Sequence, residues 1–215
     1  MIKGIILDLD GLISDTERLH MKAFQQAFKE KGMEISDDFY KKHWIQIGHG
    51  TEDVLKILGS DISADAIRAI KNVYYEDYLH TDLYPMAYVH DFVEHFYGKI
   101  PMAVASASKG FDVEFILKAL DLERYMEFFL SADDVKKRKP DPEVWLLAAK
   151  KLGLDPEDCI TLEDAEKGVI ASYRAGIPCI AIPNSYTADN DFSKATYMAK
   201  DLKEARDLIE NILNK

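Results

Sequence analysis

The spacing of apolar residues divides the chain into an all-helical stretch and a stretch in which short apolar runs alternate with amphipathic segments. The first ten residues contain a continuous apolar run that ends in carboxylates and a glycine, which predicts a short buried strand. Helix-capping residue types then stand at Ser14 to Thr16, apolar residues recur at helical spacing, and Gly32 marks a stop. Further helices are predicted over 36–46, 51–58 and 63–80, so residues 14–80 contain only helices.

The pattern changes after Tyr84 and Pro85. Strands are predicted over 101–108, 128–132, 159–164, 178–183 and 196–200, and helices over 110–120, 141–152, 166–175 and 202–213. Strands that alternate with helices form parallel sheets with helices on both faces. We therefore predict an α/β fold: a Rossmann-like parallel sheet in a catalytic core domain of residues 1–13 and 84–215, and an inserted all-helical cap domain of residues 14–83.

Polar residues capable of chemistry follow three of the predicted strands. Asp8 and Asp10 follow the first strand, Ser106 the second, and Glu163 and Asp164 another. The carboxyl ends of parallel strands meet at one edge of the sheet, where ligands bind. Two acidic pairs at this edge would repel each other without a cation between them, and oxygen ligands suit Mg²⁺. The helical insertion leaves from the same edge, so we expect it to act as a lid.

Two further residues have two interpretations each. Lys139 lies in a basic run, 136–140, that reads either as a solvated loop or nuclear-import patch, or as a fixed positive charge beside carboxylates and a phosphate. Pro140 and Pro142, which directly follow Lys139 and Asp141, restrict the backbone there. Ser106 either caps a helix or donates its hydroxyl and backbone N–H to an anion. The residue types alone leave both questions open.

Four motifs occur in a fixed order along the chain: DLDGLISDT from Asp8, VASAS around Ser106, KPDPE from Lys139 and LEDAEKG around Asp164. In this order they resemble the four motifs of the haloacid dehalogenase superfamily of phosphotransferases. The spacing also resembles the subfamily with a helical cap after the first strand, which contains β-phosphoglucomutase and many sugar-phosphate phosphatases. The resemblance implies a cleft closed by the cap and a small phosphorylated substrate.

The resemblance also implies roles for the acidic residues. Asp8 would be the nucleophile that forms an aspartyl-phosphate. Asp10 would protonate the leaving oxygen and then activate the water that hydrolyses the intermediate. Asp8, the main-chain carbonyl of Asp10, Asp164 and Glu163 would hold Mg²⁺. Phosphoryl transfer depends on such in-line positioning and charge neutralisation.

Phosphate and substrate contacts follow from the same resemblance. Ser106, Ala107 and Lys139 would bind the phosphoryl oxygens. The candidate substrate-binding residues lie in the cap and after the second strand: His20, Gly48, His49, Thr51, Ser108 and Lys109. For His20, the alternative is an ordinary, partly exposed helix histidine.

Departures from the family pattern narrow the predicted activity. Dehalogenases lack the second aspartate, whereas Asp10 is present here. β-Phosphoglucomutases carry two cations in the cap that hold a second phosphate, and Ile47 and Thr51 stand at the matching positions. We therefore predict a phosphoric monoester hydrolase acting on a sugar or polyol phosphate. A mutase-like isomerase and a catalytically silent binding protein on the same fold are the alternatives.

Composition adds limits on partners and location. The net charge of −11 argues against a general role on nucleic acid or an anionic membrane. No apolar run approaches the roughly 18 residues of a membrane span, and Asp8 and Asp10 interrupt the N-terminal run as a signal-peptide core. Only Cys159 and Cys179 are present, which favours a reducing cytoplasm. With no long apolar stripe, a monomer is expected.

Overall fold

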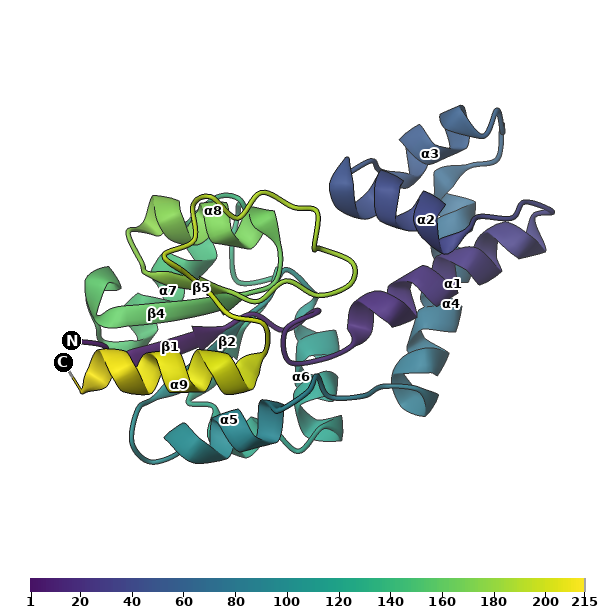
Figure 1. Ribbon diagram of the computed structural model, residues 1–215. Helices are drawn as coiled ribbons and strands as arrows, with labels where there is room; N and C mark the ends of the chain where they lie inside the picture. The colour runs from purple at the N-terminus through teal and green to yellow at the C-terminus, as the bar shows by residue number, and fades with distance from the viewer. Residues whose placement is uncertain (215) are drawn as a thin grey trace. The chain divides into compact units, whose positions relative to one another are not determined.

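The computed structural model describes residues 1–214, which form two compact units (Figure 1). One unit combines Met1–Ser14 with the chain from Pro85 onward, and the other is Asp15–Tyr84. Both ends of the second unit lie one residue later in the chain than the limits of 14 and 83 expected from the sequence. The first unit is called the core and the second the cap.

The core contains a six-stranded parallel sheet in the order β3-β2-β1-β4-β5-β6. Ile5 of the central strand pairs with Met102 on one side and with Ile160 on the other. The strands β1, β2, β4 and β5 are buried along their whole length, which explains their continuous apolar runs. The strands are β1 (Gly4–Leu7), β2 (Met102–Ala105), β3 (Phe128–Leu130), β4 (Cys159–Glu163), β5 (Cys179–Ala181) and β6 (Tyr197–Met198).

Helices cover both faces of this sheet, with α7 and α8 on one face and α5, α6 and α9 on the other (Figure 1). This arrangement confirms the predicted Rossmann-like α/β fold. Gly153 and Gly176 end α7 and α8 in the left-handed conformation, as the sequence indicates. The core helices are α5 (Val89–Phe96), α6 (Gly110–Ala119), α7 (Glu143–Leu152), α8 (Glu166–Ala175) and α9 (Leu202–Leu213), with single 3₁₀ turns η2 (Glu123–Tyr125) and η3 (Pro156–Asp158).

Trp145 organises the packing between α7 and α8. Its side chain is fully buried, and its indole N–H donates to the Gly168 carbonyl over 3.2 Å. Replacing such a residue by alanine typically costs about 3–5 kcal/mol. Trp145 also lies in one buried cluster with Ile6 of β1 and Cys159 of β4, so its packing holds α7 against the strands that end in the acidic residues.

The cap is all-helical and has its own apolar core. Its helices are α1 (Thr16–Glu30), α2 (Asp37–Tyr40), the π-helix η1 (Lys41–Gln46), α3 (Thr51–Ile57) and α4 (Ala64–Thr81). Phe28, Val54 and Ile67 are fully buried at its centre. The sequence predicts side-chain capping at the N-terminus of the first helix, and this prediction is wrong. The Ser14 hydroxyl donates to the Leu9 carbonyl, and no side chain forms an N-terminal capping hydrogen bond to α1.

Candidate active site

Asp8 directly follows β1 and is held at the end of its ladder with β4. The Asp8 N–H donates to the Leu162 carbonyl over 3.0 Å, and Asp8 is only 6% exposed. The chain then turns at Gly11, which has a φ of +82°, and the Gly11 N–H donates to the Ser14 carbonyl over 2.8 Å. Glycine suits this turn because it enters the left-handed region without strain. The turn keeps both Asp8 and Asp10 at the carboxyl edge of the sheet.

The Lys139 side chain lies among the acidic residues at the carboxyl edge of the sheet. Its ammonium donates to Asp8 Oδ1 over 2.5 Å, to Glu163 Oε1 over 2.8 Å and to the Ala105 carbonyl over 3.1 Å. Its side chain is 7% exposed and its Nζ lies 3.9 Å from the centre of the Trp145 ring. The interpretation of Lys139 as a solvated charge is therefore wrong, although its neighbours at 136–138 are exposed.

Burial and charge set the pKa values of this pair in opposite ways. Burial is the main cause that raises the pKa of Asp8 to about 8, with further repulsion from Glu163 and Asp10, while Lys139 acts against the rise. For Lys139, burial lowers the pKa, but the carboxylates of Asp8 and Glu163 outweigh it and raise the pKa above its ordinary value. Burial thus favours the neutral form of the Asp8 carboxyl, whereas the neighbouring carboxylates favour the charged form of Lys139.

Three carboxylates at this edge form a donor set that fits a divalent cation. Asp8, Glu163 and Asp164 are buried, and each offers an oxygen within 4.8 Å of the others. With Lys139 as their cation, they leave two negative charges for a divalent ion to balance. All the donors are oxygens, the ligand type that Mg²⁺ prefers. Among residues 1–214 this is the one such acidic cluster.

Glu163 has room in this cluster because the residue of α8 beside it is a glycine, Gly168. A Cβ at Gly168 would lie 1.6 Å from Glu163 Oε1, so any other residue there would displace the carboxylate. Glu163 Oε2 accepts the Ala165 N–H over 2.8 Å. The glycine of the LEDAEKG motif thus makes room for Glu163 between β4 and α8.

Asp10 is held by two serines from the loop after β2. Both Ser106 Oγ and Ser108 Oγ donate to Asp10 Oδ2, over 2.9 and 2.8 Å. The Ser108 N–H donates to Ser106 Oγ over 2.9 Å. The helix that follows has Lys109 at its N-cap position, so Ser106 does not cap it. The structure thus joins the second aspartate to the serine motif.

The other predicted residues of this loop face solvent. Ala107 and Lys109 are exposed, and Lys109 Nζ lies 5.6 Å from the centre of the Phe111 ring. They stand at the same strand end as Ser106, where an incoming ligand can reach them.

The predicted cap residues lie in the other unit. His20 stacks on Tyr75 at 4.0 Å between ring centres, and burial, with a contribution from Lys71, lowers its pKa well below the ordinary value. His49 Nδ1 lies 3.1 Å from His43 Nδ1 in a hydrogen bond. Thr51 is buried at the start of α3, and Gly48 is exposed with a φ of +76°. Their roles toward a substrate stay predictions.

One polar residue at the edge was not predicted from the sequence. Asn184, in the loop after β5, donates from Nδ2 to Asp164 Oδ2 over 2.7 Å and to the Gly11 carbonyl over 3.0 Å. Its position in the sequence could have indicated it. Ligands bind at the carboxyl ends of parallel strands, and Asn184 follows β5 as Asp164 follows β4.

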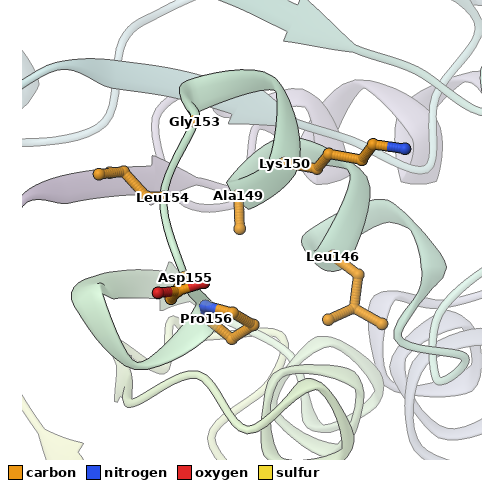
Figure 2. A pocket seen from close by; sticks show the side chains of 7 residues that line it. All are labelled: Leu146, Ala149, Lys150, Gly153, Leu154, Asp155 and Pro156. Carbon is orange, nitrogen blue, oxygen red and sulfur yellow. The ribbon is translucent and has the colours of Figure 1, made fainter.

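A hollow of about 340 Å³ lies elsewhere, between α7 and the loop before η3 (Figure 2). That loop leads into the start of β4, so the hollow lies toward the amino edge of the sheet. It contains one carboxylate and one ammonium, without the clustered acids of the other edge. It is lined by Leu146, Ala149, Lys150, Gly153, Leu154, Asp155 and Pro156.

None of the helices within residues 1–214 combines the length and apolarity needed to cross a bilayer.

Known proteins match this chain over most of its length. The fructose-1-phosphate phosphatase YqaB of Escherichia coli (strain K12) is 29% identical over 180 residues, which cover 83% of this chain and 95% of that protein. The phosphorylated carbohydrates phosphatase of Thermotoga maritima is 29% identical over 181 residues, 82% of each chain. The crystal structure of CbbY from Rhodobacter sphaeroides in complex with phosphate aligns with a TM-score of 0.78 at 24% identity, covering 95% of this chain and 96% of that one.

These matches confirm the predicted fold and the predicted class of enzyme, a phosphoric monoester hydrolase. Residues 5–182 also match the family model of haloacid dehalogenase-like hydrolases. That span contains all four motifs and the acidic edge built from them. The chain belongs to the haloacid dehalogenase-like hydrolase family.

Proposed function

We propose that this chain is a Mg²⁺-dependent phosphatase of a small phosphorylated sugar or polyol, acting through an aspartyl-phosphate on Asp8. One observation carries the proposal: Asp8 is buried in contact with Lys139 beside Glu163 and Asp164. A buried group with a strongly perturbed pKa among charged partners is typical of a catalytic site. The phosphatase names of the two sequence relatives support the substrate class.

The proposed first step forms a covalent intermediate on Asp8. A carboxylate oxygen of Asp8 attacks phosphorus, and the bond between phosphorus and the sugar oxygen breaks. Asp10 gives its proton to the departing oxygen, so the sugar leaves as a neutral alcohol. Lys139 stabilises the negative charge of the reacting groups, because its ammonium is already fixed beside Asp8.

The proposed second step releases phosphate. Asp10, now ionised, takes a proton from water, the water oxygen bonds to phosphorus, and the bond to Asp8 breaks. Asp8, Glu163, Asp164 and the Asp10 carbonyl would hold Mg²⁺, which supplies charge neutralisation for the phosphoryl oxygens when bound. Ser106 and the Ala107 backbone would donate to those oxygens. Ser106 now contacts Asp10, so a bound phosphoryl group would exchange that partner.

The cap would select the substrate. The substrate would be contacted by His20, Gly48, His49 and Thr51 of the cap. Ser108 and Lys109 of the core would also contact it. Neither of the two cap positions that matter for a mutase carries a charge: Ile47 is an exposed apolar residue and Thr51 is buried. A second phosphate would lack these two cationic partners, so water would discharge the intermediate. The buried thiols of Cys159 and Cys179 support action in a reducing cytoplasm.

The test is phosphate release from a panel of sugar phosphates that includes fructose 1-phosphate. The wild-type protein with Mg²⁺ is compared with a chelated sample and with Asp8→Asn, whose carboxamide is a poor nucleophile. We expect metal-dependent release that falls by roughly 10⁴-fold or more in the variant. Release that survives Asp8→Asn would contradict the covalent mechanism. Conversion of glucose 1-phosphate to glucose 6-phosphate with a bisphosphate primer would favour the mutase instead.

A further inference from the structure

We infer that Asn184 is a positioning residue of the cation site: its side-chain amide orients Asp164 and ties it to the turn that follows Asp8. This inference rests on the proposed function, because it assigns a role toward the proposed Mg²⁺ site. It adds a residue from the loop after β5 to a site that the four motifs build from the ends of other strands.

The orientation of the Asn184 amide is determined by its own loop. Asn184 Oδ1 accepts the backbone N–H groups of Tyr186, over 2.8 Å, and Thr187, over 3.3 Å. Only an oxygen can accept these bonds, so the amino group must be at the opposite end. Both protons of that amino group are used: one reaches Asp164 Oδ2 over 2.7 Å and the other the Gly11 carbonyl over 3.0 Å.

The amide bridges segments that are far apart in the sequence. Gly11 belongs to the turn after β1 and Asp164 follows β4, and neither motif contains Asn184. A Cβ at Gly11 would lie 2.4 Å from Asp164 Oδ2 and 2.9 Å from Asn184 Nδ2. The three groups are therefore in close contact, with no room for a side chain between them.

The loop that carries the amide is itself well anchored. The Asn184 N–H donates to Thr187 Oγ1 over 3.1 Å, and Thr187 is buried. Before it, the Ile182 N–H donates to the Glu163 carbonyl over 2.7 Å and continues the ladder between β4 and β5. Asn184 thus stands on a fixed segment, as a residue must if it is to fix another.

The chemistry of the amide suits this role. A neutral donor fixes the Asp164 carboxylate without adding a charge that would compete with a cation. Hydrogen-bond partners of metal-binding carboxylates typically change metal affinity by about 10–100-fold when removed. Loss of the amide should therefore weaken Mg²⁺ binding, while substrate binding at saturating Mg²⁺ changes little.

The experiment measures Mg²⁺ binding by isothermal titration calorimetry on the full chain at pH 8. Asn184→Ala removes the amide. Asn184→Ser removes the donor to Asp164 but keeps an oxygen for the N–H groups of the turn, which protects the loop fold. The control is Asn190→Ala, the same substitution in the same loop; Asn190 accepts the Glu166 N–H over 3.3 Å. Thermal unfolding with chelator confirms that each variant is folded.

We expect both Asn184 variants to bind Mg²⁺ about tenfold or more weakly and Asn190→Ala to stay within twofold of wild type. In steady-state assays, the Mg²⁺ concentration for half-maximal rate should rise, with the substrate KM at saturating Mg²⁺ unchanged. Asn184 variants that bind Mg²⁺ like wild type, or a control that weakens equally, would overturn the inference alone. A wild-type protein that binds no Mg²⁺ would overturn the proposed metal site and the inference together.

Discussion

Two aspartates, one in each unit, show how differently the core and the cap use charge. Asp8 in the core is buried with Lys139, and burial raises its pKa to about 8. Asp82 in the cap pairs with Lys22 and Arg18, and these cations lower its pKa below the ordinary value. The Asp82 side chain is 25% exposed, against 9% for Asp8.

The difference separates structural from chemical use of charge. An ion pair near the surface contributes about 0–1 kcal/mol to the stability of the fold, and no catalytic role is needed to explain it. A buried cluster of like charges is unfavourable for folding unless it is paired or binds a cation. The core retains three such carboxylates around one lysine. We attribute the first pattern to cap stability and the second to catalysis, and four changes test this contrast.

Removal of the Lys139 ammonium should have the largest effect. Lys139→Ala takes away the charge that contacts Asp8 and Glu163, and we expect phosphate release to fall by roughly 10²–10³-fold. Lys137→Ala is the matched control, because Lys137 lies in the same loop, is 72% exposed and pairs only loosely with Asp141 over 3.6 Å. Equal losses in the two variants would assign the effect to the loop and contradict the contrast.

The pKa of Asp8 predicts how Mg²⁺ binding depends on pH. Below about pH 8 the metal-free site holds a proton on Asp8, which a binding cation must displace. Mg²⁺ affinity should therefore rise by about tenfold per pH unit toward pH 8 and level off above it. Calorimetry in buffers of different ionisation enthalpy measures the proton released. An affinity that is flat from pH 6 to 8 would show that Asp8 is already ionised there.

Charges added to the cap should change the fate of the intermediate. The double variant Ile47→Lys and Thr51→Arg supplies two cations where a second phosphate would bind in a mutase. We expect a several-fold rise in transfer to a second sugar hydroxyl relative to hydrolysis, measured as isomerised product per phosphate released. Ile57→Lys is the control, since it adds a charge at another exposed apolar position of the cap. An unchanged ratio would contradict our interpretation of Ile47 and Thr51.

Neutralising Asp82 should have the smallest effect. Because the pKa of Asp82 is lowered in the folded state, its stabilising contribution is present above its unfolded pKa of about 4 and is lost as the pH falls through the folded value. Asp82→Asn should reduce the free energy of unfolding by about 0.5–1 kcal/mol at pH 7 and by less at pH 3. Urea titrations at both pH values measure this, with phosphate release expected to stay near wild type.

Particular residues show what the sequence could predict. Asp8, Asp10, Ser106, Glu163 and Asp164 were expected at one edge because each follows an apolar strand, and parallel strands end together. The structure places them there. Gly153 and Gly176 marked two helix ends because their left-handed conformation is a local property.

Other features depend on contacts that no local pattern records. Asn184 lies twenty residues after Asp164, and its partner Gly11 lies at the other end of the chain. The helix α5 was missed because it is short and begins after Tyr88, a residue with a φ of 66° rather than a capping type. Whether Lys139 is exposed to solvent or buried beside carboxylates was left open, because the burial of one lysine in a basic run depends on tertiary packing. The monomeric state stays a prediction.

The covalent mechanism is tested most directly by detecting the phosphoryl group on Asp8. Asp10→Asn is mixed with acetyl phosphate and Mg²⁺, because this substrate's leaving group needs no proton while the variant cannot activate water for release. Rapid acid quench, digestion and mass spectrometry then locate the phosphoryl group. We expect a phosphorylated peptide that contains Asp8 and that is absent from the double variant with Asp8→Asn. An unmodified Asp8, or a phosphoryl group on another residue, from a preparation whose wild type hydrolyses acetyl phosphate would contradict it.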